Sequence, residues 1–427
     1  MAVVSSGTGT PKVLLDPNKN YTAPLVVVTA LFFMWGFITC MNDILIPHLK
    51  EVFQLTFVEA MLIQLTFFGA FFIMSIPSGW IISKIGYKNG IIVGLALAGI
   101  GCFMFYPAAE TRIYIFFLAA LFVLASGITV LQVAANPYVA ILGKVETSSS
   151  RLNLAQAFNS LGTTIAPYIG KILIFTTVTL SAAQLASLSI SDKENYFMEK
   201  VKSVEMPYVG LAVVLFVLAV LIKFSSLPSI DAETEDEKGS FAGALKHSHL
   251  LLGVIAIFMY VGGEVSIGSF LINFLKDPKI AGFDEHKASE FVSYYWGGAM
   301  FGRFIGAALL SKINPEKALG AVGLIVVALL ATTLLSTGST AMWSVIAIGF
   351  FNSIMFPTIF TLAIRNLGID TNKGSSLLIM AIVGGALVPV FQGLLADKIG
   401  VQASFILPVV CYLYVMYYGF IGSKVRA

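Results

Sequence analysis

The 427-residue chain is 57% hydrophobic and only 11% charged, whereas a soluble domain carries roughly 25% charged residues. This deficit excludes an ordinary soluble domain and predicts a protein that crosses a membrane many times. The formal net charge of +3 is small, and its scattered distribution argues against nucleic-acid binding.

The chain begins with a polar stretch and contains three widely separated cysteines. The first twenty residues, MAVVSSGTGTPKVLLDPNKN, lack the long apolar segment of a cleaved signal peptide. We expect a cytoplasmic tail over 1–22, followed by a first hydrophobic helix that acts as an uncleaved insertion signal. Cys40, Cys102 and Cys411 match neither a metal site nor a disulfide framework, and are interpreted as small core residues.

A helix needs about 20 predominantly apolar residues to cross the roughly 30 Å of hydrocarbon in a bilayer. Membrane β-strands would instead alternate apolar and polar residues. The sequence predicts twelve helical spans, in chain order at 24–47, 58–82, 89–108, 113–142, 152–176, 207–227, 250–275, 289–311, 318–336, 340–364, 375–397 and 401–422.

Orientation is predicted from the lysines and arginines in the loops. More of them fall on the N-terminal side of the membrane than on the opposite side, which predicts that this side is cytoplasmic. Both termini are therefore expected inside.

The longest cytoplasmic connection, PSIDAETEDEKGSFAGALKHSHL, contains an acidic run followed by a short amphipathic piece. It separates two sets of six spans with repeated features. GWIISKIGYKNGIIVGL at 79–95 resembles AALLSKINPEKALGAVGL at 307–324, and TTIAPYIG corresponds in position to GALVPVFQG. Six-plus-six repetition is typical of transporters whose halves rock around a midplane site. The predicted division is a tail, an N-terminal bundle, a linker and a C-terminal bundle, at 1–22, 23–227, 228–249 and 250–427.

Two carboxylates lie inside predicted spans, Asp43 in the first and Glu264 in the seventh. Intramembrane carboxylates are costly and usually line an aqueous cavity or an ion path. Both are interpreted as functional, although Asp43 lies near Pro47 and could reach water at a helix end. Arg303 could pair with a carboxylate or cap a helix, and a structural role is favoured for it.

Amides recur inside the spans. Gln132 and Asn136 are four residues apart, and Gln156 and Asn159 are three apart, so each pair shares one helix face. Amides offer both donors and acceptors, which suits a polyhydroxylated ligand, although each could instead clasp two helices. The predicted ligand-binding residues are Gln64, Gln132, Asn136, Gln156, Asn159, Glu264, Asn273, Asn352 and Trp296, the last as a stacking platform for a sugar ring.

Four motifs carry a family resemblance: MNDILIPHLKEVFQL, AANPYVAILG, RLNLAQAFNSLG and FPTIFTLAIRNLG. With these, the chain resembles the fucose–proton symporter family of the major facilitator superfamily, nearest its bacterial glucose/galactose transporter branch. The resemblance implies an all-α membrane protein with two pseudo-symmetric six-helix bundles, and cation-coupled monosaccharide uptake. It also implies that Asp43 matches the family's aspartate in the first helix, and that Gln156 and Asn159 match its sugar-contacting amides.

The chain departs from the fucose symporter where that protein has a glutamate before AANP, because Gln132 stands there. Glu264 occupies a position where an amide is expected. Replacing a titratable group by Gln132 removes a proton acceptor but keeps an oxygen ligand, which favours Na⁺ over H⁺ as the coupling ion, with H⁺ through Glu264 as the alternative. The predicted coupling residues are Asn42, Asp43, Gln132 and Glu264, with Asp43 as the charged ligand of a possible Na⁺.

The predicted function is uptake of a hexose such as glucose or galactose by cation symport through alternating access. The rival functions are a passive sugar facilitator or channel and a proton-driven exporter of small apolar compounds. An enzyme is not expected, because no nucleophile elbow, phosphate loop or metal-ligand spacing is found. The expected partners are the sugar, the cation and the lipid bilayer, with no cofactor and no nucleic acid. We expect a monomer in the bacterial cytoplasmic membrane.

Overall fold

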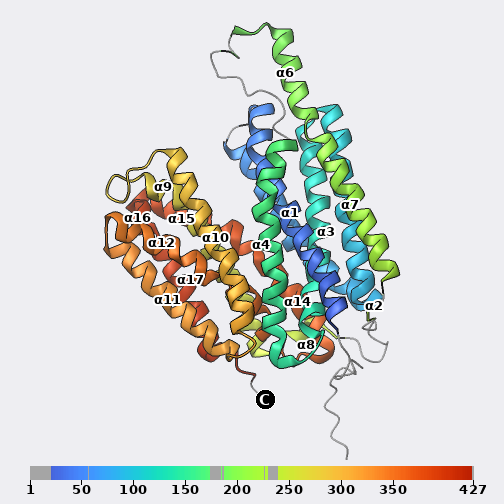
Figure 1. The fold of residues 1–427 in the computed structure, drawn as a ribbon, viewed down its shortest axis with the longest axis vertical. Coiled ribbons are helices and arrows are strands. Elements are labelled where there is room, and N and C mark those ends of the chain that lie inside the picture. Colours follow the sequence, from blue (N-terminus) through green and yellow to red (C-terminus); the bar gives the residue numbers. More distant parts are fainter. Residues whose placement is uncertain are drawn as a thin grey trace, which may run out of the picture.

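The computed structural model describes residues 21–55, 57–173, 184, 187–225, 227–228 and 239–425. Every regular element in these ranges is a helix, which confirms the predicted all-α fold class. Figure 1 shows the earlier helices gathered on one side of the molecule and the later ones on the other.

The earlier helices are α1 (Thr22–Val52), α2 (Phe57–Thr111), α3 (Tyr114–Ile141), α4 (Ser148–Leu173), α6 (Ile190–Lys202) and α7 (Glu205–Phe224). The predicted spans 58–82 and 89–108 both lie in α2, which contains a non-helical residue, Gly86, with φ 77° and ψ 169°. Glycine adopts this backbone conformation at little cost, so the two predicted spans are separated there by a kink rather than a loop. The α6 helix extends beyond the ends of its neighbours (Figure 1) and falls between the predicted spans 152–176 and 207–227.

The later helices are α8 (Phe241–Ala244), α9 (Ser248–Lys276), α10 (Glu285–Leu309), α11 (Pro315–Leu335), α12 (Gly338–Asn352), α13 (Met355–Ala363), α14 (Thr371–Met380), α15 (Gly384–Ile399), α16 (Val401–Ser404) and α17 (Ile406–Tyr417). Three predicted spans are thus interrupted. The span 340–364 divides into α12 and α13, and the span 375–397 divides into α14 and α15 around a short 3₁₀ turn. The span 401–422 divides into α16 and α17.

Within the described residues, nine segments are long and apolar enough to cross a membrane, judged by length and composition alone. One of them, Leu62–Thr111, covers two predicted spans. The predicted spans 152–176 and 289–311 fall largely on α4 and α10, which are helices but more polar than the nine. Residues 174–176 of the first span lie outside the described residues. Polarity within a spanning helix indicates a face turned away from lipid.

Local sequence explains several helix starts. Asn314 caps α11 by accepting from the backbone N–H groups of Glu316 and Lys317, and Pro315 follows at the first helical position. Asp284 caps α10 in the same way. Side-chain caps of this kind satisfy N–H groups that have no partner within the helix.

Glycines allow neighbouring helices to approach closely. A Cβ atom on Gly36 of α1 would lie 2.1 Å from the backbone oxygen of Asn159, and one on Gly162 of α4 would lie 2.2 Å from that of Phe33. The α1 and α4 backbones are therefore in direct contact. Membrane helices commonly pack through such small residues, because lipid supplies no hydrophobic force to drive them together.

The two groups of helices lie apart at the top of Figure 1 and come together below, near α14 and α8. Hydroxyl groups connect them there. Ser149 Oγ of α4 lies 2.6 Å from Thr361 Oγ1 of α13, and Ser150 donates to the backbone oxygen of Ala307 at 2.6 Å. Ser375 of α14 donates to the backbone oxygen of Val133 in α3 at 3.0 Å.

Candidate functional site

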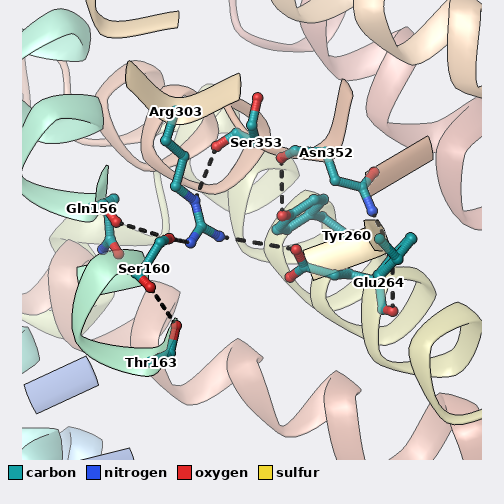
Figure 2. A network of polar contacts seen from close by, with 9 residues as sticks. Gln156, Ser160, Thr163, Tyr260, Glu264, Arg303, Asn352 and Ser353 are labelled. Atoms are coloured by element: carbon teal, nitrogen blue, oxygen red, sulfur yellow. Dashed lines mark hydrogen bonds and ion pairs between the residues drawn. The ribbon is translucent and has the colours of Figure 1, made fainter. Parts of the chain in front are cut away.

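A largely buried arginine lies where α4, α9, α10 and the α12–α13 junction meet (Figure 2). Arg303 of α10 donates through Nη1 to Ser160 Oγ of α4, and through Nε to the backbone oxygen of Ser353 at 3.4 Å. Its Nη2 lies 4.0 Å from Glu264 Oε1 of α9. One guanidinium group therefore connects an earlier helix with three later helical segments.

Glu264 is held from the opposite side by an aromatic and amide cluster. Tyr295 donates to the Glu264 backbone oxygen at 3.3 Å, and Asn352 Nδ2 donates to the Tyr295 hydroxyl at 2.9 Å. Tyr260 donates to the Asn352 backbone oxygen at 3.1 Å. These bonds fix α9, α10 and α12 relative to one another around the carboxylate.

Glu264 Oε1 and Asn352 Oδ1, both buried at the atomic level, accept no hydrogen bond of normal length and geometry among the described residues, although the Tyr260 hydroxyl lies near Glu264 and the Tyr412 hydroxyl lies near Asn352. The 4.0 Å contact to Arg303 is an electrostatic interaction that is too long for a hydrogen bond. Buried acceptors without donors are unfavourable, and hydroxyl donors from a ligand would satisfy them. The cluster therefore offers acceptors and a guanidinium donor in one place, which suits a ligand rich in hydroxyl groups.

Gln156 and Asn159 of α4 differ in their surroundings. Gln156 lies one helical turn before Ser160, beside Arg303 (Figure 2), and only its backbone oxygen is engaged, by Ser160 Oγ at 3.2 Å. Asn159 Nδ2 instead donates to the Phe32 backbone oxygen of α1 at 3.0 Å. The Asn159 side chain thus makes the interhelical clasp that was the alternative to ligand binding, whereas the Gln156 amide remains available.

Gln132 and Asn136 of α3 are both buried, with exposed fractions of 5% and 0%. Neither side-chain polar atom of Asn136 has a hydrogen-bond partner among the described residues. An amide left unsatisfied in this way is unusual in a core, and it keeps Asn136 a candidate for binding.

The remaining predicted residues do not join this network. Gln64 and Asn273 are exposed, and Trp296 is 43% exposed, with its ring packed over Gly268 of α9. Asn42 and Asp43 lie on α1, but their side chains fall outside the described residues. The predicted cation site, including Asp43 as a ligand, therefore stays a prediction.

Ser160, Tyr260 and Ser353 were not predicted from the sequence, and Arg303 was assigned mainly a structural role. Helical spacing could have indicated two of them. Ser160 is four residues after Gln156, and Tyr260 is four residues before Glu264, so each shares a helix face with a predicted residue. The Arg303–Ser160 contact joins residues 143 positions apart, and no local pattern reveals it.

Comparisons with known proteins agree with the fold. A family model described as Major Facilitator Superfamily matches residues 26–377. The glucose/galactose transporter of Brucella abortus is 54% identical over 411 residues, covering 95% of this chain and 96% of that protein. The L-fucose-proton symporter of Escherichia coli is 35% identical, covering 92% of each. The crystal structure of the transporter FucP in the outward conformation superposes with a TM-score of 0.87 at 34% identity, covering 94% of this chain and 99% of that one.

Proposed function

Because the chain belongs to the Major Facilitator Superfamily, a family of membrane transporters, we propose that it takes up a hexose such as glucose or galactose by cation symport. The names of relatives that align along almost the whole chain support a sugar substrate. The L-fucose-proton symporter of Escherichia coli supports coupling to a cation.

The observation that carries the proposal is the polar cluster around Arg303. Arg303 supplies donors, Glu264 and Asn352 supply buried acceptors, and Gln156 lies beside them on the facing helix. A hexose presents hydroxyl groups that both donate and accept. In the proposed complex it donates to Glu264 Oε1 and Asn352 Oδ1, and accepts from the guanidinium group and the Gln156 amide.

Alternating access would expose this cluster to each side of the membrane in turn. The N-terminal bundle (23–227) and the C-terminal bundle (250–427), joined by the linker 228–249, would rock against each other about the contact between α4 and α10. We place both termini on the cytoplasmic side of the bacterial inner membrane and treat the monomer as the transporting unit.

We assign cation coupling to Asp43 of α1, with Na⁺ favoured over H⁺. A Na⁺ site needs several oxygen ligands, which Asp43, Asn42 and Gln132 would supply together with backbone carbonyls. Glu264 is the alternative carrier, for a coupling proton, with the Arg303 guanidinium 4.0 Å from its carboxylate. Coupling is reciprocal, so the cation must tighten sugar binding by the same factor as the sugar tightens cation binding.

The test is uptake of labelled glucose and galactose into proteoliposomes containing the purified protein. An inward Na⁺ gradient without a pH gradient should drive accumulation above equilibrium, and Asp43→Asn should abolish that accumulation while exchange persists. Accumulation driven by a pH gradient alone would show that H⁺, and not Na⁺, is the coupling ion. Flux that never exceeds equilibrium would instead indicate a facilitator, and gradient-driven efflux of apolar compounds without hexose uptake would indicate an exporter.

A further inference from the structure

A groove of about 410 Å³ runs along the outer side of α10, between that helix, α11 and the α12–α13 junction. It lies apart from the face of α10 that carries Arg303 toward α4. Its lining is almost entirely apolar and includes Ile305, Leu309 and Ile313 on one side and Ala318, Ala321 and Val322 on the other.

The floor of the groove is formed where α10 presses against the end of α12. A Cβ atom on Gly302 would lie 2.5 Å from the Phe350 backbone oxygen, and one on Gly306 would lie 2.1 Å from a methyl carbon of Ile354. These two glycines bring α10 and α12 together, while α11 forms the other wall with small side chains. The groove arises because α10 packs closely against α12 but leaves a gap toward α11.

The groove is open to the surroundings of the protein. Ile305, Leu309 and Ile313 are 48%, 50% and 46% exposed, and all three belong to segments predicted to lie in or at the edge of the membrane. Exposed aliphatic side chains at that depth face acyl chains, so the natural occupant of the groove is a lipid tail.

Basic side chains at the α11 end of the groove determine which kind of lipid head group can bind there. Lys317 lines the groove in the first turn of α11, and Lys312 precedes it in the same exposed connection. The neighbouring Glu316 is neutralised by Arg365, whose Nη1 lies 2.6 Å from Glu316 Oε1. The start of α11 also carries the positive end of its helix dipole. This end of the groove is therefore net positive.

We propose that the groove binds one anionic phospholipid, with an acyl chain along α10 and α11 and the phosphate at Lys317. The floor includes Ser353 and Ile354, where α12 gives way to α13, and the Ser353 backbone oxygen accepts from Arg303. A bound acyl chain would cover this interruption from the lipid side. Irregular backbone at membrane depth must be satisfied within the protein, and Arg303 does this here by donating to the Ser353 backbone oxygen, so an apolar chain can lie against the junction without leaving that oxygen unpaired.

The experiment measures thermal unfolding and native mass spectra of the detergent-purified protein with added dioleoyl phosphatidylglycerol or dioleoyl phosphatidylcholine. Phosphatidylglycerol should bind more tightly and raise the unfolding temperature more. Lys317→Gln should weaken phosphatidylglycerol binding about fivefold, as expected when one basic side chain near an anionic head group is neutralised. Lys317→Arg should retain the preference. Ala321→Trp, which fills the groove from its rim, should reduce binding of both lipids.

Two variants control for nonspecific effects: Lys398→Gln, at another exposed helix end, and Val93→Trp, on the exposed face of α2. Both should behave as the wild type. Inorganic phosphate should produce no shift, because the site requires the acyl chain. Equal binding of the two lipids by the wild type, or an unchanged preference in both Lys317→Gln and Ala321→Trp, would overturn the proposal.

Discussion

At the scale of single residues, the Arg303–Glu264 contact joins two charged side chains from different helices. The two side chains are only 15% and 12% exposed, so each charge would be poorly solvated without the other. A buried pair is often no more stable than two apolar residues of similar volume, but removing one partner alone is strongly destabilising. The contributions of Arg303 and Glu264 to stability therefore depend on each other.

Neutralising one member of this pair should lower the stability of the protein more than neutralising both. We expect Glu264→Gln or Arg303→Met to lower the free energy of unfolding by about 3 kcal/mol, and the double variant to recover much of that loss. Calorimetry or thermal unfolding of the purified variants measures this. Glu110→Gln is the matched control, because its contact with Lys202 at 3.0 Å is exposed on both sides and should contribute at most about 1 kcal/mol. Additive losses in the double variant would show that the two charges act independently.

Substitution of Gln156 should affect sugar binding, whereas substitution of Asn159 should affect the stability of the protein. Gln156→Ala should weaken sugar binding by about 5- to 150-fold, the effect of losing one buried hydrogen bond of roughly 1–3 kcal/mol, without changing the unfolding temperature. Asn159→Ala removes the clasp to Phe32 and should lower the stability of the protein by about 1 kcal/mol. Equilibrium sugar binding and thermal unfolding of both variants test the distinction. If Gln156→Ala loses stability but keeps its affinity, Gln156 also serves only in packing.

At the scale of helices, the contact between α1 and α4 depends on glycine. The sequence around Gly36 and Gly162 contains no other signal that these two helices touch, yet a Cβ atom at either position would overlap backbone of the partner helix. Backbone cannot move aside as a flexible side chain can, so the helices would have to separate.

Gly162→Ala should therefore destabilise the protein, although alanine is the better helix former by about 1 kcal/mol. Gly69→Ala is the control, since nothing lies within 4 Å of a Cβ atom at that position in α2. The unfolding temperature should fall for Gly162→Ala and stay level or rise for Gly69→Ala. Equal responses of the two variants would show that α1 and α4 have room for a methyl group at Gly162.

At the scale of the whole molecule, the earlier and later helices are joined by short hydroxyl contacts near α13 and α14. The Ser149–Thr361 distance of 2.6 Å places one residue from each group close enough for a disulfide after substitution. If transport requires the two groups to move apart at this end, a covalent link there should stop the cycle.

We expect Ser149→Cys with Thr361→Cys, after oxidation, to lose net hexose uptake while still binding hexose, and to regain uptake after reduction. The background should lack Cys40, Cys102 and Cys411, and thiol counting should verify the bond. Each single substitution serves as a control and should transport normally under both conditions. Unimpaired uptake by the oxidised double variant would show that this contact does not open during transport.

The apolar segments and the polar positions within them were predictable from the sequence because both are local properties. A helix in hydrocarbon must satisfy its own backbone groups, so a long apolar run specifies its own structure. Each predicted span has helical structure in the described residues. Glu264 and Asn352 were singled out for the same reason, since a polar side chain inside such a run is conspicuous wherever it packs.

The partners of those side chains were decided only by the tertiary structure. Gln156 and Asn159 have nearly the same sequence signal, yet Asn159 is engaged by α1 while Gln156 lies beside Arg303. Arg303 has Ser160 and Glu264 as neighbours because three helices from both parts of the chain meet there. Helical periodicity specifies the direction of a side chain relative to its own helix, but the neighbouring helix is supplied by packing between segments far apart in the sequence.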